Sequence, residues 1–190
     1  PSISSGKITS RFLQKSQMAF PMEFGSIEFL TFSKIMPFNG RVDAGNMEYT
    51  KSGSDLFVRL DPGEEIHSTL QQLVNDIGID AAAITSGIGR TRDNQYGYMN
   101  EEGVYIRRLL EPPSELVSLS GNIARTEEGA AFTHIHCCWS DDDDAVYAGH
   151  MFQSVVHVVA EIHIRIMDHA MMTRCPLADV ELLGLQFSNE

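Results

Sequence analysis

The segment between residues 61 and 78 has the clearest helical pattern in the chain. Apolar side chains recur there at intervals of three and four residues, which places them on one face of a helix: Ile66, Leu70, Leu73, Val74 and Ile77. The residues before them are typical of a helix N-terminus, with Asp61 as the cap, Pro62 in the first turn and Glu64 completing a capping box. Gly78 is typical of a helix end. We therefore predict a helix that begins after Asp61 and ends at Gly78.

Most of the chain beyond residue 55 otherwise has the alternation and residue types of β-strands. Strands are predicted at residues 56–60, 79–84, 96–99, 104–110, 115–123, 131–139, 145–152, 155–167 and 180–187. The segment Ser86-Gly87-Ile88-Gly89 is predicted to interrupt the strands, because glycine and serine favour turns. One helix among many strands predicts an α+β domain with a mostly antiparallel, twisted sheet.

Residues 155–167 alternate most regularly. One predicted face is apolar and consists of Val156, Val158, Ala160, Ile162, Ile164 and Ile166. The opposite face is polar and consists of His157, Glu161, His163 and Arg165. This alternation is typical of a strand that packs one face against the core.

The strand predicted at residues 131–139 places two histidines on one face. Side chains alternate with a period of two, so Phe132, His134, His136 and Cys138 share a face. His134 and His136 are then separated by about 7 Å. His150 lies in the next predicted strand. A register that pairs His150 with His134 or His136 places all three imidazoles on one face, whereas a slip of one residue points His150 away.

Three neutral imidazoles with one open position are typical of a catalytic or ligand-binding zinc site, so His134, His136 and His150 are the predicted metal ligands. Cys138 shares their face and is a candidate fourth ligand, although a free cysteine is more often a buried small side chain. The alternative is that the histidines are ordinary surface or interface residues. Spacing alone leaves both interpretations open, and other divalent metals are alternatives to zinc.

The charge balance argues against direct binding of nucleic acid. The chain has 26 acidic and 14 basic side chains, and its formal net charge is −12. Residues 1–44 contain five basic and three acidic side chains, so the remaining nine basic and 23 acidic side chains give −14. Non-specific binding to DNA depends on neutralising phosphates, and a domain this acidic repels DNA unless a basic patch or a partner intervenes. No stretch approaches the roughly 18–20 apolar residues of a membrane span, so no membrane partner is expected.

Three cysteines make an odd count without the spacing of a disulfide framework, which favours a reducing compartment and a cytoplasmic location. Residues 1–46 have no long periodic run, so we expect an N-terminal extension there and the folded domain at residues 47–190. The first 22 residues contain three basic side chains and no acidic ones, which weakly resembles an organelle presequence. An organelle is therefore the alternative location.

Several short motifs, taken together and in order, resemble the PPC family, a domain conserved in plants and prokaryotes. They are RLDPGE at residues 59–64, SGIG at 86–89, LVSLSGN at 116–122, His134-Ile135-His136, Gly149-His150-Met151 and Ala160-Glu161. The resemblance covers nearly all of residues 49–188. The chain departs from the family pattern in two places: Met151 stands where Leu is usual, and Cys137-Cys138 stand where aliphatic residues are usual.

The resemblance implies a mostly antiparallel sheet with one long helix, assembled as a homotrimer. It also implies a zinc site, because His134, His136 and His150 match the ligands of prokaryotic members that bind zinc. The family fold resembles that of acetolactate decarboxylase, a metal enzyme with a three-histidine site. Plant members are called DNA-binding because of an Arg-Gly-Arg-Pro element before the domain. This sequence has no such element, so DNA is a partner by family description only.

Two classes of function follow from these observations. One is a metal-binding homotrimer that acts in regulation or protein assembly. The other is a metal-dependent enzyme, of lyase or hydrolase type, that acts on a small oxygenated molecule. Glu161 is the candidate catalytic residue, because a carboxylate near a bound metal acts as a general base or orients a ligand. The alternative is that Glu161 belongs to a solvated face of the sheet.

Overall fold

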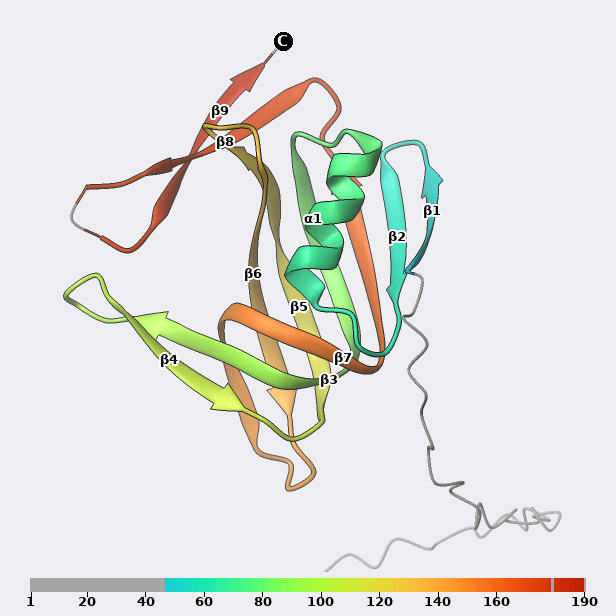
Figure 1. Cartoon of the computed structure of the whole chain (residues 1–190), viewed down its shortest axis with the longest axis vertical. Helices are drawn as coiled ribbons and strands as arrows, with labels where there is room; N and C mark the ends of the chain where they lie inside the picture. Colours follow the sequence, from blue (N-terminus) through green and yellow to red (C-terminus); the bar gives the residue numbers. More distant parts are fainter. Residues whose placement is uncertain (1–46, 179, 190) are drawn as a thin grey trace, which may run out of the picture. The chain divides into compact units, whose positions relative to one another are not determined.

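The computed structural model describes residues 47–178 and 180–189, and the extension expected at residues 1–46 lies outside them. The described residues form nine strands and one helix (Figure 1). In chain order these are β1 (Glu48–Ser52), β2 (Asp55–Leu60), α1 (Ile66–Ile77), β3 (Ala82–Met99), β4 (Tyr105–Leu110), β5 (Ser114–Thr126), β6 (Ala131–Ser140), β7 (Val146–Ile166), β8 (Ala170–Pro176) and β9 (Leu183–Asn189). No helix within the described part is long and apolar enough to cross a membrane.

The strands form one sheet, with β1-β2-β7-β3-β5-β8-β9 as its main order. In addition, β4 pairs with β3, and β6 pairs with both β5 and β7. The pairings β3–β5, β5–β6, β6–β7 and β7–β3 therefore close a circuit. Strands β5 and β8 run parallel, whereas the other pairs are antiparallel, so the sheet is mixed. The prediction of a β-sheet with one helix is confirmed.

The hydrophobic core lies between α1 and the sheet (Figure 1). Leu70 and Leu73 of α1 are buried there together with Ile135 and Trp139 of β6 and Ile162 of β7. Burying a side chain of this size contributes roughly 1.5–3 kcal/mol. The same packing fixes which face of β6 points away from the core.

The helix begins four residues later than predicted. Its N-cap is Glu65, whose carboxylate accepts hydrogen bonds from the backbone N–H groups of residues 67 and 68. The carboxylate of Glu64 does accept from the backbone N–H of Asp61, at 2.6 Å, but these residues form a turn before the helix. Gly63 in that turn has φ +93°, which is incompatible with a right-handed helix. The predicted helix end at Gly78 is confirmed, with φ +70°.

The predicted interruption at residues 86–89 is wrong, because β3 continues through it. A Cβ at Gly89 would lie 2.2 Å from the backbone oxygen of Val159 on β7. Glycine therefore permits a close approach of two strands here and does not mark a turn. The strands predicted at 145–152 and 155–167 are likewise one continuous strand, β7.

One further difference comes from irregular pairing. Between Arg90 and Thr91 the register against β7 jumps from Val159 to Val156, so β7 has extra residues at this point. The jump turns Val158 outward, and its side chain is 53% exposed, although alternation had predicted it to face the core. Strands β1 and β8 were not predicted, and the last strand begins at Leu183.

Candidate metal centre and pocket

Strands β6 and β7 bring the three predicted histidines together. Thr133, Ile135 and Cys137 face the core, which leaves His134 and His136 on the opposite face of β6. His136 pairs directly with His150 across the β6–β7 hairpin, one of the two registers that place all three on one face.

The three imidazole rings are mutual neighbours. Ring centroids are 5.1 Å apart for His134 and His136, 4.9 Å for His134 and His150, and 5.3 Å for His136 and His150. One ring nitrogen from each residue lies within 4.8 Å of the corresponding nitrogens of the other two. Among the described residues, Nε2 of His134 and Nδ1 of His150 are buried without a hydrogen-bond partner. The arrangement therefore directs imidazole nitrogens at a shared space.

The helix supports this arrangement from the core side of the sheet. His67 of α1 donates from Nε2 to the backbone oxygen of Met151, at 3.0 Å. A carbonyl oxygen can only accept, so the proton of the neutral ring is on Nε2 and Nδ1 is an acceptor. Nδ1 accepts from the hydroxyl of Thr133, at 2.6 Å. Thr133 and Met151 are the immediate neighbours of His134 and His150, so one side chain connects both histidine-bearing strands.

The surroundings favour the neutral form of the histidines. Burial lowers the pKa of His134 to about 4, and the positive charge of Arg174 acts in the same direction. Burial also lowers the pKa of His150 to about 4, followed by the effect of neighbouring histidines. Burial lowers the pKa of His136 as well. Neutral imidazoles have lone pairs available, which is the form that binds metals.

Arg174 of β8 is a neighbour of the histidines that sequence analysis did not identify. One terminal nitrogen, Nη2, donates to Nδ1 of His134 at 3.1 Å and to the side-chain oxygen of Asn122 at 2.6 Å. The other, Nη1, donates to the backbone oxygen of Leu183 at 2.8 Å. Because a guanidinium can only donate, Nδ1 of His134 acts as the acceptor.

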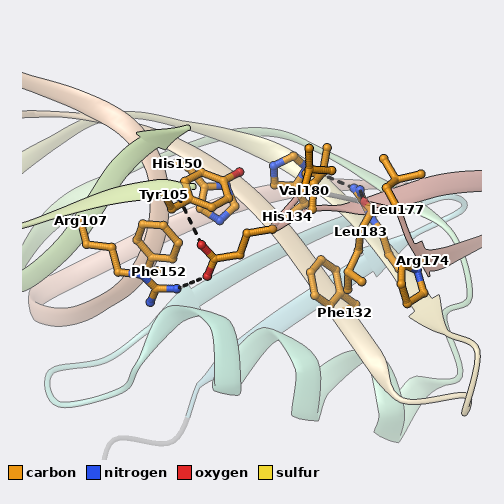
Figure 2. A pocket seen from close by; sticks show the side chains of 13 residues that line it. Tyr105, Arg107, Phe132, His134, His150, Phe152, Arg174, Leu177, Val180 and Leu183 are labelled. Carbon is orange, nitrogen blue, oxygen red and sulfur yellow. Dashed lines mark hydrogen bonds and ion pairs between the residues drawn. The ribbon is translucent and has the colours of Figure 1, made fainter. Parts of the chain in front are cut away.

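A pocket of about 360 Å³ lies beside His134 and His150 (Figure 2). Its wall is mostly apolar and aromatic. The side chains come from β4, β6, β7, β8, the segment between β8 and β9, and the first residue of β9: Tyr105, Phe132, Phe152, Pro176, Leu177, Val180, Leu182 and Leu183. The ring of Tyr105 lies 4.9 Å from that of His150. The charged groups of the wall are Arg107, Arg174 and Glu181. Pockets with an apolar wall and few polar groups are typical of small-molecule sites.

Two of the pocket's charged groups form an ion pair at one side. Glu181 accepts from Nη2 of Arg107, at 3.3 Å, and from the backbone N–H of Tyr105, at 3.2 Å (Figure 2). The guanidinium carbon of Arg107 also lies 4.0 Å from the centre of the Phe152 ring. This side of the pocket therefore has balanced charge.

The other candidates from sequence lie apart from the cluster. Glu161 lines a second hollow together with Ile88, Val117 and Val158, and the pocket beside the histidines does not include it. Within one chain it is not placed beside the three histidines. Cys138 pairs with Ala148 across the hairpin and is not among the residues whose ligand atoms converge in the described part. The cysteines of the described part are all free thiols.

Comparison with known proteins identifies the family. Residues 47–168, more than half of the chain, match the profile of the Plants and Prokaryotes Conserved (PCC) domain. Comparison with curated proteins finds no match.

Solved structures with the same fold come from archaea and bacteria. A metal-containing protein from Archaeoglobus fulgidus is 29% identical, with a TM-score of 0.65, over 75% of this chain and 99% of that one. A plant- and prokaryote-conserved (PPC) protein from Pyrococcus horikoshii is 25% identical, with a TM-score of 0.62, over 74% and 95% of the two chains. A protein from Bacteroides thetaiotaomicron, described as a candidate DNA-binding protein, is 22% identical with a TM-score of 0.68, over 74% and 97%, and shows the fold alone. The chain thus belongs to the plant- and prokaryote-conserved domain family, the family that its motifs resemble.

Proposed function

We propose that this protein binds a divalent metal ion, zinc, through His134, His136 and His150. The observation that supports this most strongly is the convergence of three imidazole nitrogens within 4.8 Å. In the same cluster, Nε2 of His134 and Nδ1 of His150 are buried without a partner among the described residues. A buried polar atom without a partner is costly, and a metal ion would satisfy both. A zinc ion held by three imidazoles at about 2.0–2.1 Å keeps an open position. The metal content of the Archaeoglobus fulgidus protein is in line with the proposal.

Metal binding has a consequence for Arg174. In the neutral ring of His134, Nδ1 accepts from Arg174, so the proton is on Nε2. If Nε2 held the metal, this proton would have to move to Nδ1. Arg174 would then have to release Nδ1, because two N–H donors cannot share one contact. The guanidinium and the proposed metal therefore oppose each other at His134.

Metal analysis tests the proposal directly. We expect about one zinc ion per chain in protein produced without added metal. The His134→Ala, His136→Ala double variant is expected to lose it, whereas the His157→Ala, His163→Ala double variant keeps it. The second variant is the control, because it also removes two histidines, both on β7 and both outside the cluster. Equal metal content in the wild type and the His134/His136 variant would overturn the proposal.

We also propose that the domain assembles as a homotrimer. The supporting observation is the second hollow, where Ile88, Val117 and Val158 are 55%, 54% and 53% exposed and lie together. Contiguous exposed apolar side chains are typical of interfaces. Light scattering should give the mass of three chains for the wild type and of one chain for Val158→Glu. Val146→Glu, an exposed position outside the hollow, is the control. A wild-type mass of one chain would contradict the proposal.

A metal-dependent enzyme is the second candidate function, and the pocket beside the histidines favours it over a purely structural metal. A bound zinc ion with an open position supplies Lewis-acid activation of an oxygen-bearing molecule. The chain's own contribution would be to hold that molecule against the apolar wall and to exclude water. Screening small oxo- and hydroxy-acids for turnover that is lost on chelation tests this candidate. Absence of turnover across the series would leave the regulatory or assembly class.

A further inference from the structure

Arg174 is the one buried arginine of the described chain without a carboxylate partner. Six of the eight arginines described have a carboxylate oxygen within 4.0 Å: Arg59, Arg90, Arg92, Arg107, Arg125 and Arg165. Arg108 has none, but its side chain is exposed to water. Arg174 is only 6% exposed and has none among residues 47–178 and 180–189. A buried charge is costly unless an opposite charge compensates it.

The neutral groups around Arg174 hold it in place without balancing its charge. Asn122 and Leu183 each supply one oxygen, and His134 supplies a ring nitrogen. The Nε–H group remains buried without a partner among the described residues.

The pocket wall is therefore positive although the whole chain is strongly acidic. It has two guanidinium groups, Arg107 and Arg174, against the single carboxylate of Glu181, which leaves one net positive charge. The metal proposed above would add two more positive charges.

We propose that the pocket binds a small organic carboxylate, with its charge facing Arg174 and a short apolar body against the Phe132 and Leu183 side of the wall. The inference depends on the proposed metal site in one respect only: a further oxygen atom of the ligand, outside the carboxylate, would face the metal. A volume of about 360 Å³ is typical of a small-molecule site. The apolar wall disfavours inorganic phosphate, which has no apolar part and needs several donors.

The test uses butanoate, its neutral isostere butanamide and inorganic phosphate, titrated calorimetrically into the full chain. We expect butanoate to bind saturably and both other probes to bind at least about tenfold more weakly. Arg174→Gln is expected to weaken butanoate binding about tenfold or more while its metal content is unchanged or higher, since the variant removes a positive charge beside the histidines. Arg108→Gln, with the same change in net charge outside the pocket, should bind like the wild type.

A second variant keeps the inference testable if Arg174→Gln does not fold. Glu181→Gln removes the carboxylate of the pocket but keeps an acceptor for Tyr105, so butanoate binding should tighten severalfold. Equal binding of butanoate and butanamide, or no change in either pocket variant, would overturn the inference. Arg174-dependent binding in a wild type that contains no metal would uphold the inference and defeat the metal proposal. One metal ion per chain without butanoate binding would uphold the metal proposal and defeat the inference about the carboxylate.

Discussion

The chemistry of the site depends on three imidazoles whose pKa values are all lowered by burial. His134 and His150 are shielded from water by the strands around them and by the pocket wall, and a proton on either ring would be poorly solvated. In the unfolded chain the same histidines have ordinary pKa values near 6.5. The folded state consequently disfavours their protonation, which is also what keeps their lone pairs available for a metal.

This difference predicts how stability depends on pH in the metal-free protein. Since the pKa values are lowered on folding, the unfolded state takes up more protons between about pH 6.5 and pH 4. Stability is therefore complete above pH 6.5 and falls as the pH falls toward 4. Urea unfolding measured from pH 7.5 to 5 should show this loss in the wild type. The His134→Gln, His150→Gln variant should show a slope smaller by up to about two protons. Equal slopes in the two proteins would refute the assigned pKa shifts.

At the scale of elements, the register between β6 and its neighbours determines where the histidines point. Gly121 of β5 faces the backbone of His134, and a Cβ at this glycine would lie 2.0 Å from the backbone oxygen of His134. The approach of β5 to β6 is therefore possible only without a side chain at this position. On the other side of β6, the pairing of His136 with His150 depends on the hairpin that joins β6 to β7.

We predict that Gly121→Ala separates β5 from β6 at the site. The clash with backbone atoms should cost about 1–3 kcal/mol of unfolding free energy and reduce the metal bound per chain. Ser120→Ala, an exposed neighbour on the same strand, should change neither quantity. Denaturant unfolding and metal analysis of the three proteins measure both effects. Wild-type stability and metal content in Gly121→Ala would contradict the prediction.

The elements also show how far the sequence could predict the structure. Alternation was sufficient for β6, because its odd-numbered residues from Thr133 to Trp139 are buried in the core and its two histidines lie on the opposite face. It failed at Val158, because the extra residues of β7 turn this side chain toward the other face of the sheet. No local sequence pattern indicates such a bulge. The helix start failed because Gly63 adopts a left-handed turn. Arg174 was missed because β8 reaches the site by pairing with β5, a strand distant in sequence, and nothing in the sequence connects it with His134, 40 residues away.

At the scale of the whole molecule, charge distinguishes the proposed ligands from DNA. The chain beyond residue 44 has a net charge of −14, whereas the pocket wall is locally positive. A small anion inside the pocket is attracted by the nearest charges, but a polymer outside it is repelled by the full surface. The description of one structural relative as a candidate DNA-binding protein belongs to that protein.

We predict no direct association with duplex DNA. Titration of a labelled duplex at about 50 mM salt, which favours electrostatic binding, should give no change in anisotropy up to micromolar protein. The reason is that few cations on this chain can displace counterions from the phosphates. Association that weakens with salt along a steep slope would contradict this prediction and favour the regulatory class with direct DNA contact.

X-ray absorption at the zinc edge, on the full chain purified without added metal, can show directly whether the three histidines hold a zinc ion. We expect a zinc signal with three imidazole nitrogens at about 2.0–2.1 Å and one further light atom. The spectrum should lose imidazole scattering in His150→Ala. No zinc signal, or the spectrum of a hydrated ion without imidazole scattering, would contradict the assignment of His134, His136 and His150 as metal ligands.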